Sequence, residues 1–207
     1  MSKNKLTKFN EIKSFEHVVQ APFNTIRNNN FHLKGRWAPG FFYNENPVVV
    51  ELGCGKGEYT VELAERFPHT NFIGVDIKGA RLWKGAKIAL ERKLKNVAFL
   101  RTNIEIIGQF FGTNEIDEIW LTFPDPQMKK TRKRLTSTTF LNKYKNFLKK
   151  EGIIHLKTDS NFQFTYTRAL VRKNNFKVLH ETDNLYESEI LNETLQIKTF
   201  YEKQWLS

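Results

Sequence analysis

Short runs of apolar, β-branched residues alternate with amphipathic helical patterns along most of this chain, and this alternation constrains its fold more than any other feature. The apolar runs lie at 48–52, 71–77, 96–100, 117–123 and 152–159, and helical spacing covers 57–67, 81–94, 137–150 and 161–175. Two further runs, 176–182 and 195–205, are typical of closing strands. Strands that alternate with helices form parallel sheets covered on both faces. We therefore predict an α/β fold with a doubly wound, mostly parallel seven-stranded sheet.

The N-terminal part of the chain lacks this regular pattern. Residues 1–46 are polar and rich in Asn and Lys, and their hydrophobic patterning is interrupted. We predict that residues 1–34 form a basic, partly flexible arm outside the core and that residues 35–207 form a single domain. A chain of 207 residues with 40% hydrophobic residues is long and apolar enough for one such core.

The charge balance points to an anionic partner. The chain has 33 Lys and Arg against 22 Asp and Glu, a net charge of +11, which favours nucleic acid, an anionic membrane or simple solubility. No apolar run approaches a membrane span, and the N-terminus lacks the apolar stretch of a signal peptide. Cys54 is the only cysteine, so we expect a cytoplasmic protein without disulfides. The five histidines lack metal-ligand spacing, so we expect no metal site.

Three glycines follow the first predicted strand, in ELGCGKGEY. Gly53, Gly55 and Gly57 allow a tight turn and the close approach of a ligand to the backbone. Their spacing differs from the dinucleotide fingerprint G-x-G-x-x-G, because Glu58 stands where the third glycine belongs. The loop also lacks the Lys-Ser/Thr pair of a P-loop. A nicotinamide cofactor is therefore disfavoured.

Polar side chains end three neighbouring predicted strands. Glu51 precedes the glycine loop and suits the amine end of a ligand, Asp76 ends the second strand and suits ribose hydroxyls, and Asn103 follows the third strand and suits an adenine edge. One nucleoside, no phosphate cradle and an acidic group near an amino-acid end together describe S-adenosyl-L-methionine. The alternative is a structural turn with an acidic helix cap.

The segment LTFPDPQMKKTRKRLT holds Asp125 between Pro124 and Pro126, which restrict the backbone on both sides, and then places five cations between 129 and 134. A solvated loop is the simple interpretation. The sharper one is a rigidly held carboxylate beside a site for a polyanion, and the net charge of +11 favours it.

Four motifs resemble known families. ELGCGKG with GVDI resembles the class I S-adenosylmethionine-dependent methyltransferases, whose fold is Rossmann-like. FPDPQMKKTRKRLT, HLKTDSNFQF and TFYE narrow the resemblance to the bacterial tRNA (guanine-N7-)-methyltransferase family, from about Gly35 to the end. The resemblance implies an enzyme that transfers a methyl group from S-adenosylmethionine to N7 of a guanine in tRNA. By family resemblance, this guanine is at position 46 of the variable loop, and the product is 7-methylguanosine.

The resemblance also assigns residues. Cofactor contacts fall on Glu51, Asp76, Asn103 and Asp125, together with the glycine loop. Substrate contacts fall on Lys129, Asp159, Thr199, Phe200, Tyr201 and Glu202. We assign Asp125 the catalytic role: the methylated ring is cationic at N7, and a nearby carboxylate stabilises that charge as it develops.

Some interpretations stay open at this point. Gln127 replaces a family tryptophan, and the basic segment is shorter than in the family and lacks its histidine. Asp159 also suits an N-cap, and the TFYE residues suit an ordinary strand end. Two other functions are a methyltransferase acting on another RNA or a small molecule, and a non-catalytic RNA-binding protein on the same fold. We expect a monomer or a homodimer that works without a membrane.

Overall fold

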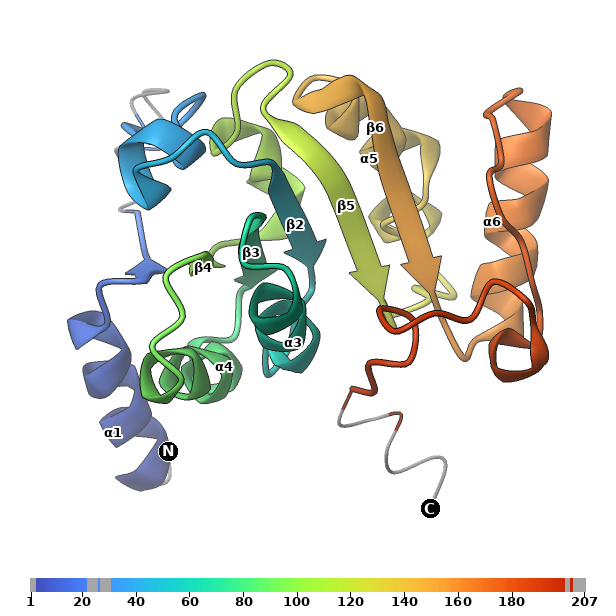
Figure 1. Ribbon diagram of the computed structural model, residues 1–207. Helices are drawn as coiled ribbons and strands as arrows, with labels where there is room; N and C mark the ends of the chain where they lie inside the picture. The colour runs from blue at the N-terminus through green and yellow to red at the C-terminus, as the bar shows by residue number, and fades with distance from the viewer. Residues whose placement is uncertain (1–2, 22–25, 27–30, 200–201, 203–207) are drawn as a thin grey trace.

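One parallel sheet of six strands organises the chain (Figure 1). The computed structural model describes residues 3–21, 26, 31–199 and 202. In the order in which they lie side by side, the strands are β1 (Val18–Val19), β4 (Val97–Arg101), β3 (Asn71–Asp76), β2 (Val48–Leu52), β5 (Ile116–Thr122) and β6 (Leu148–Lys157). Every pair is parallel, so all the carboxyl ends meet at one edge, and strand order reverses between β2 and β5.

Helices cover both faces of this sheet, as the sequence pattern predicts. The α-helices are α1 (Lys3–Glu11), α3 (Glu58–Arg66), α4 (Gly79–Glu91), α5 (Thr138–Tyr144) and α6 (Asn161–Lys173). Short helical turns are η1 (Ile12–Ser14), η2 (Ala38–Phe42), η3 (Ile104–Gln109), η4 (Thr131–Lys133) and η5 (Leu185–Glu187). In Figure 1, α3 and α4 lie in front of the sheet with α1 beside α4, α5 lies behind it, and α6 runs alongside β6.

Alternation along the strands builds two hydrophobic cores, one on each face. In β2, Val48, Val50 and Leu52 face one core and Val49 faces the other. The first core includes residues of α5, and the second includes residues of α3 and α4. Both faces of a strand are apolar only where helices cover both faces of the sheet. This explains why the sequences of these strands are continuous apolar runs.

The N-terminal segment packs against the domain, and here the predicted arm outside the core is wrong for the residues that the structure describes. Ile12 and Phe15 are buried in the core beneath α3 and α4, and β1 pairs with β4 at the sheet edge. Trp37 is fully buried, and its indole donates to the Phe110 carbonyl over 3.0 Å. These buried residues are spaced widely among polar ones in the sequence, so they gave no periodic signal.

The two predicted closing strands are also wrong in the described residues, where the sheet has six strands and not seven. Residues 176–182 form no ladder with β6, and Phe176, Val178 and Leu179 are exposed by 37 to 50%. The described part of 195–205 likewise contains no strand. Alternating apolar residues favour a strand only where a neighbour pairs with them.

The boundary between α5 and β6 also differs from the prediction. We expected a helix over 137–150 ending near Gly152, but α5 stops at Tyr144 and β6 begins at Leu148. Gly152 lies inside β6, where the register with β5 shifts, and a Cβ there would lie 2.6 Å from Leu148 Cγ. The glycine therefore serves a β-bulge and not a helix end. None of the helices in the described ranges has the length and apolar character needed to cross a membrane.

We predict that Gly85→Ala lowers the free energy of unfolding by roughly 1–3 kcal/mol, because overpacking forces neighbouring backbone to move. A Cβ at Gly85 would lie 2.6 Å from the Lys56 carbonyl oxygen and 3.0 Å from Gly57 Cα. Urea unfolding measures the change. Gly108→Ala is the matched control, since a Cβ there meets nothing within 4 Å. Equal midpoints for the two variants would contradict the close packing of α4 on the glycine loop.

Candidate functional site

The glycine loop joins the end of β2 to α3 and is hydrogen-bonded to the end of β3. The backbone N–H groups of Gly53 and Cys54 both donate to the Val75 carbonyl, over 2.8 and 3.0 Å. Gly53, Gly55 and Gly57 all have positive φ, at 83°, 58° and 73°. A Cβ on Gly55 would meet nothing within 4 Å, whereas one on Gly57 would lie 2.6 Å from Phe99. The first part of the loop therefore borders open space, and its end packs the loop on the sheet.

Glu51 lies under this loop, at the end of β2, and is only 4% exposed. Its carboxylate accepts hydrogen bonds from Thr60 Oγ1 of α3 and Thr122 Oγ1 of β5. Burial raises the pKa of Glu51, and the two hydroxyl groups oppose that rise. A carboxylate held in this way keeps acceptor capacity toward a cationic group in the open space beside the loop.

Asp76 connects the end of β3 to the same loop. Its Oδ2 accepts from the Gly55 N–H over 3.1 Å and its Oδ1 from the Lys78 N–H over 2.7 Å. Asn103 follows β4, the neighbouring strand, and its Oδ1 accepts from the Glu105 N–H over 3.0 Å, which caps η3. The structure thus brings Glu51, the glycines, Asp76 and Asn103 to one edge of the sheet.

A hollow of about 400 Å³ lies beside Asp76 and Asn103. Ile77, which is 55% exposed, lines it together with Thr102, and Gln20 and Ala21 of the N-terminal segment form another wall. An apolar side chain next to Asp76 offers the contact that a flat base requires. We did not predict Ile77, although an exposed apolar residue directly after a strand-end carboxylate was a readable signal.

The turn that holds Asp125 follows β5 and is constrained from several sides. Phe123 and Gln127 have left-handed φ values of 47° and 45°, which are uncommon outside glycine and mark strained functional turns. Asp125 is exposed, and its Oδ1 accepts from the Gln127 N–H over 2.9 Å. The Phe123 N–H donates to the Lys157 carbonyl over 2.7 Å, which ties the turn to β6.

Arg134 is a structural part of this turn, whereas the sequence placed it among the cations that meet a polyanion. It is 5% exposed, and its guanidinium donates to the carbonyls of Pro126 and Met128, each over 3.1 Å. The rings of Phe162 and Tyr166 lie 4.7 and 4.3 Å from it. Its position directly before Leu135, at the end of the run, was the only signal for burial.

The remaining cations of the run divide into two kinds. Lys133 pairs with Glu105 over 2.7 Å. Lys129, Lys130 and Arg132 are exposed on the loop that follows Asp125. Lys133 is exposed as well, so these three differ from it in that no ion pair with the described residues engages them.

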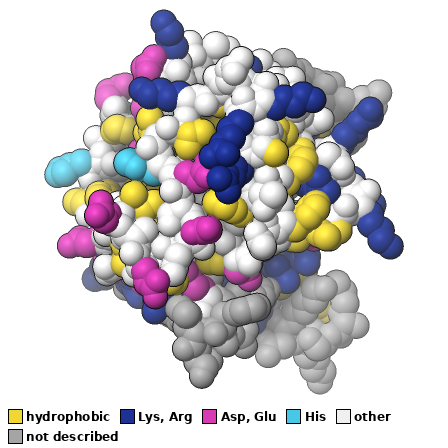
Figure 2. All heavy atoms as spheres, turned by 90° about the vertical axis from the view of Figure 1, so that its right-hand side faces the viewer, with side chains coloured by type: hydrophobic (Ala, Val, Ile, Leu, Met, Phe, Trp, Pro, Cys, Tyr) yellow, Lys and Arg dark blue, Asp and Glu magenta, His cyan; other side chains and the backbone are white. Residues whose placement is uncertain are grey.

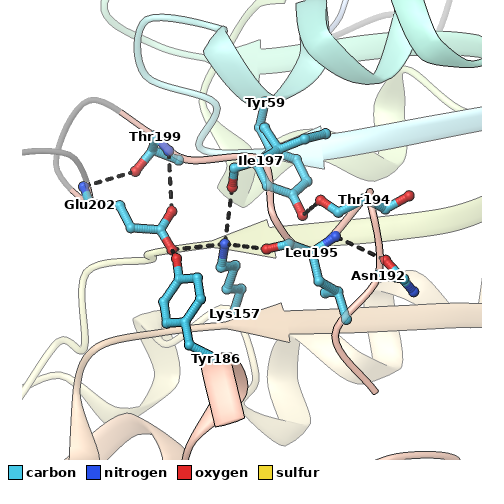
Figure 3. Close-up of polar contacts among 9 residues, drawn as sticks. All are labelled: Tyr59, Lys157, Tyr186, Asn192, Thr194, Leu195, Ile197, Thr199 and Glu202. Atoms are coloured by element: carbon cyan, nitrogen blue, oxygen red, sulfur yellow. Dashed lines mark hydrogen bonds and ion pairs between the residues drawn. The ribbon is translucent and has the colours of Figure 1, made fainter. Parts of the chain in front are cut away.

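Two predicted substrate residues, Asp159 and Lys129, are exposed at this edge of the sheet. Asp159 follows β6 but does not cap α6, because Ser160 is the N-cap and accepts from the Gln163 N–H. Thr199 and Glu202 are instead buried, at 9% and 6% exposure, and hydrogen-bond to each other (Figure 3). Phe200 and Tyr201 lie outside the described residues.

The charges on the α6 side of the molecule are not uniformly basic. Figure 2 shows acidic side chains gathered mainly on one side of this face and lysine and arginine mainly on the other. Glu181 pairs there with Arg168 and Arg172 of α6. A groove of about 1830 Å³ runs along β6 and the segment after α6, away from the glycine loop. Among the described residues, no three His, Cys, Asp or Glu side chains lie together as metal ligands would.

The sequence of this chain is similar to those of known methyltransferases. A family described as "Putative methyltransferase" matches residues 45–207. A Bacteroides fragilis protein named tRNA (guanine-N(7)-)-methyltransferase is 57% identical over 206 residues, which is 100% of this chain and 82% of that protein. Proteins of the same name from Porphyromonas gingivalis and Clostridium novyi are 55% and 35% identical, over 94% and 84% of this chain and 81% and 80% of theirs. This chain belongs to the tRNA (guanine-N7-)-methyltransferase family.

Similarity to a solved structure supports the fold and only the fold. The structure of an antibiotic-related methyltransferase superposes with a TM-score of 0.57 at 18% identity, covering 92% of this chain and 90% of that one. The cofactor of this family of enzymes is S-adenosylmethionine. The residues fit it, because Gly55 borders open space and donates to the Asp76 carboxylate, Glu51 ends the strand directly before this loop, and the hollow at Ile77 suits an adenine.

We predict that Glu51→Gln weakens S-adenosylmethionine binding roughly 10- to 100-fold, since a charge-assisted contact contributes about 1.5–3 kcal/mol. The ionised carboxylate attracts the donor's ammonium group, so affinity in the unmodified chain should rise as the pH increases through the raised pKa of Glu51. The variant should lose that part of the pH dependence. Titration calorimetry across this pH range measures both effects.

Glu62→Gln on the same helix as Thr60 is the control, because Glu62 pairs with Arg92 at the surface. Donor affinity that did not change in Glu51→Gln would remove Glu51 from the cofactor site.

Proposed function

We propose that this chain transfers the methyl group of S-adenosylmethionine to N7 of a guanine in tRNA and so forms 7-methylguanosine. The observation that carries the proposal is the Asp125 turn. Asp125 stands between two prolines in a turn where Phe123 and Gln127 have left-handed φ values. The turn follows β5, the neighbour of the strand that ends at Glu51, and exposed cations come after it. Relatives that carry this activity in their names match the chain over its whole length.

The methyl transfer requires little acid–base catalysis from the protein. Neutral guanine presents a lone pair at N7, so no side chain has to remove a proton first. When bound, S-adenosylmethionine supplies an activated methyl group. The chain's residues align the base and stabilise the positive charge that develops on its ring. Asp125 suits that second role, because its carboxylate is exposed while its backbone is held by Arg134 and β6.

The exposed loop cations supply the contact with RNA. Lys129, Lys130 and Arg132 follow Asp125 directly, so phosphates next to the target guanine would lie within their reach. Asp159, exposed at the end of β6, offers a second carboxylate for the hydrogen-bond donors of a guanine edge.

One finer feature of the proposal, the guanine at position 46 of the variable loop, comes from family resemblance. A cytoplasmic location and catalysis without a metal follow from the single cysteine and the spacing of the histidines, and a monomer or homodimer is also proposed. The roles of the individual site residues are proposals as well. A methyltransferase for another RNA or a small molecule stays the first alternative, and a non-catalytic RNA-binding protein is disfavoured by the intact donor site.

Nucleoside mass spectrometry of unmodified tRNA, incubated with the protein and labelled S-adenosylmethionine, tests this function. We expect labelled 7-methylguanosine, and none when guanine 46 is replaced by adenine. A different methylated nucleoside would support the same donor and fold but overturn the assigned substrate atom. Product formed from the tRNA without guanine 46 would overturn the assigned position.

We predict that Asp125→Asn lowers kcat at least 100-fold, as is usual when one group that stabilises transition-state charge is removed. Asparagine keeps the acceptor for the Gln127 N–H, so the turn and donor binding should persist. Asp125→Ala should lose turnover to the same extent or more. Single-turnover methylation and donor titration measure the two properties, with Glu91→Gln on the exposed end of α4 as control. Turnover that stayed unchanged in Asp125→Asn would end this assignment.

We predict that replacing Lys129, Lys130 and Arg132 together by glutamine flattens the salt dependence of tRNA binding. Each lost phosphate contact should reduce the slope of log affinity against log salt by about 0.7–0.9. Arg168→Gln with Arg172→Gln is the control, since those guanidinium groups pair with Glu181. A slope equal to that of the unmodified chain would make the three cations an ordinary solvated surface.

A further inference from the structure

A buried lysine lies at the end of β6, where the proposed function does not yet use it. Lys157 is 7% exposed. Its ammonium group donates to the carbonyls of Leu195 and Ile197, over 2.8 and 3.0 Å, and pairs with Glu202 Oε1 at 2.8 Å (Figure 3). An ammonium group has three donors, so all three are satisfied by one segment of the chain.

Glu202 is held on every side by the protein. Its Oε1 accepts from the Tyr186 hydroxyl as well as from Lys157, and its Oε2 accepts from the Thr199 N–H over 3.2 Å. In return, its own N–H donates to Thr199 Oγ1 over 3.3 Å. The carboxylate is thus engaged by chain groups at both oxygens, and at 6% exposure it is directed into the protein.

This cluster adjoins the Asp125 turn directly. The backbone carbonyl of Lys157 accepts a hydrogen bond from the Phe123 N–H at the base of the turn. Its side chain contacts Leu195, Ile197 and Glu202. Tyr59, from α3, donates to the Thr194 carbonyl over 2.8 Å and lies on the other side of the same segment. One residue therefore connects the catalytic turn with the segment that the family resemblance assigns to the substrate.

The ion pair between Lys157 and Glu202 stabilises the protein only when both charged groups are present. Removing two charges from water is costly, and either charge left alone in this environment would be more costly still. Burial lowers the pKa of Lys157, while Glu202 opposes that effect. The intact pair therefore stabilises residues 195–199 and Glu202 in this position, and the loss of either partner would destabilise them.

We propose that Lys157 is a positioning residue for tRNA methylation. Through Glu202 and the carbonyls of Leu195 and Ile197, its side chain holds residues 195–199 and Glu202 beside the Asp125 turn. This inference rests on the proposed function. It assigns to Lys157 the placement of Glu202, a residue that the family resemblance assigns to the substrate.

A double-mutant cycle tests the pairing. Lys157→Met keeps most of the side-chain length without the charge, and Glu202→Gln keeps the shape of its partner. We expect each variant to lower kcat/KM for tRNA at least tenfold, mainly through KM, with donor affinity changed less than about twofold. The double variant should be no worse than either single one by more than about threefold, because all three break the same contact.

Hydrogen exchange of the protein without tRNA gives a readout that does not depend on catalysis. The amides of residues 195–199 should lose protection in Lys157→Met and in Glu202→Gln. Tyr186→Phe, which removes a single hydrogen bond, should show a smaller effect of the same sign. Lys149→Met is the matched control, because Lys149 lies on the same strand and pairs with Asp117 at the surface over 2.6 Å.

Three outcomes would overturn the inference. Unchanged protection and unchanged KM in Lys157→Met would show that the lysine holds nothing the reaction needs. Effects that multiply in the double variant would show that Lys157 and Glu202 act independently of each other. An equal loss in Lys149→Met would indicate a general weakening of β6. Failure of the proposed function would be a separate result, because the unmodified chain would then form no 7-methylguanosine. The hydrogen exchange of the variants could still be compared in that case.

Discussion

The site depends on a buried carboxylate that three elements share. Glu51 ends β2, and its oxygens accept from a threonine of α3 and a threonine of β5. A carboxylate at 4% exposure is tolerated only when such donors are present, so the hydrogen bonds fix how β2, α3 and β5 meet. The glycine loop and the Asp125 turn both begin within a few residues of this junction, and their separation is therefore fixed as well.

From that junction the structure extends to β6 through the backbone. Thr122 binds Glu51, the next residue donates to the Lys157 carbonyl, and the Lys157 side chain holds the C-terminal segment. The proposed donor site, the Asp125 turn and the segment that contains Leu195 and Glu202 are thus joined by a series of short contacts. A methyl transfer that relies on alignment needs such a connection, because small displacements of the base relative to the donor are costly in rate.

The basic character of the chain divides between structure and recognition. Arg134 is buried next to the rings of Phe162 and Tyr166 and fixes the turn. Lys133 is exposed but pairs with Glu105, whereas Lys129, Lys130 and Arg132 are exposed without such an ion pair among the described residues. The net charge of +11 predicted an anionic partner, which agrees with membership of a family whose substrate is tRNA. It could not indicate which cations meet that partner, because each charge is used according to its neighbours in space.

The sequence by itself determined the central sheet, the glycine loop and the sheet edge at which Glu51, Asp76, Asn103 and Asp125 follow their strands. Continuous β-branched runs and helical spacing are local signals, and parallel strands place their carboxyl ends together wherever they pack. Only the tertiary structure decided that Ile12 and Trp37 are buried, that residues 176–182 pair with no strand, and that Lys157 meets Glu202. Those outcomes depend on contacts between residues far apart in the chain, and local periodicity shows which residues are apolar or charged but not which partners they find.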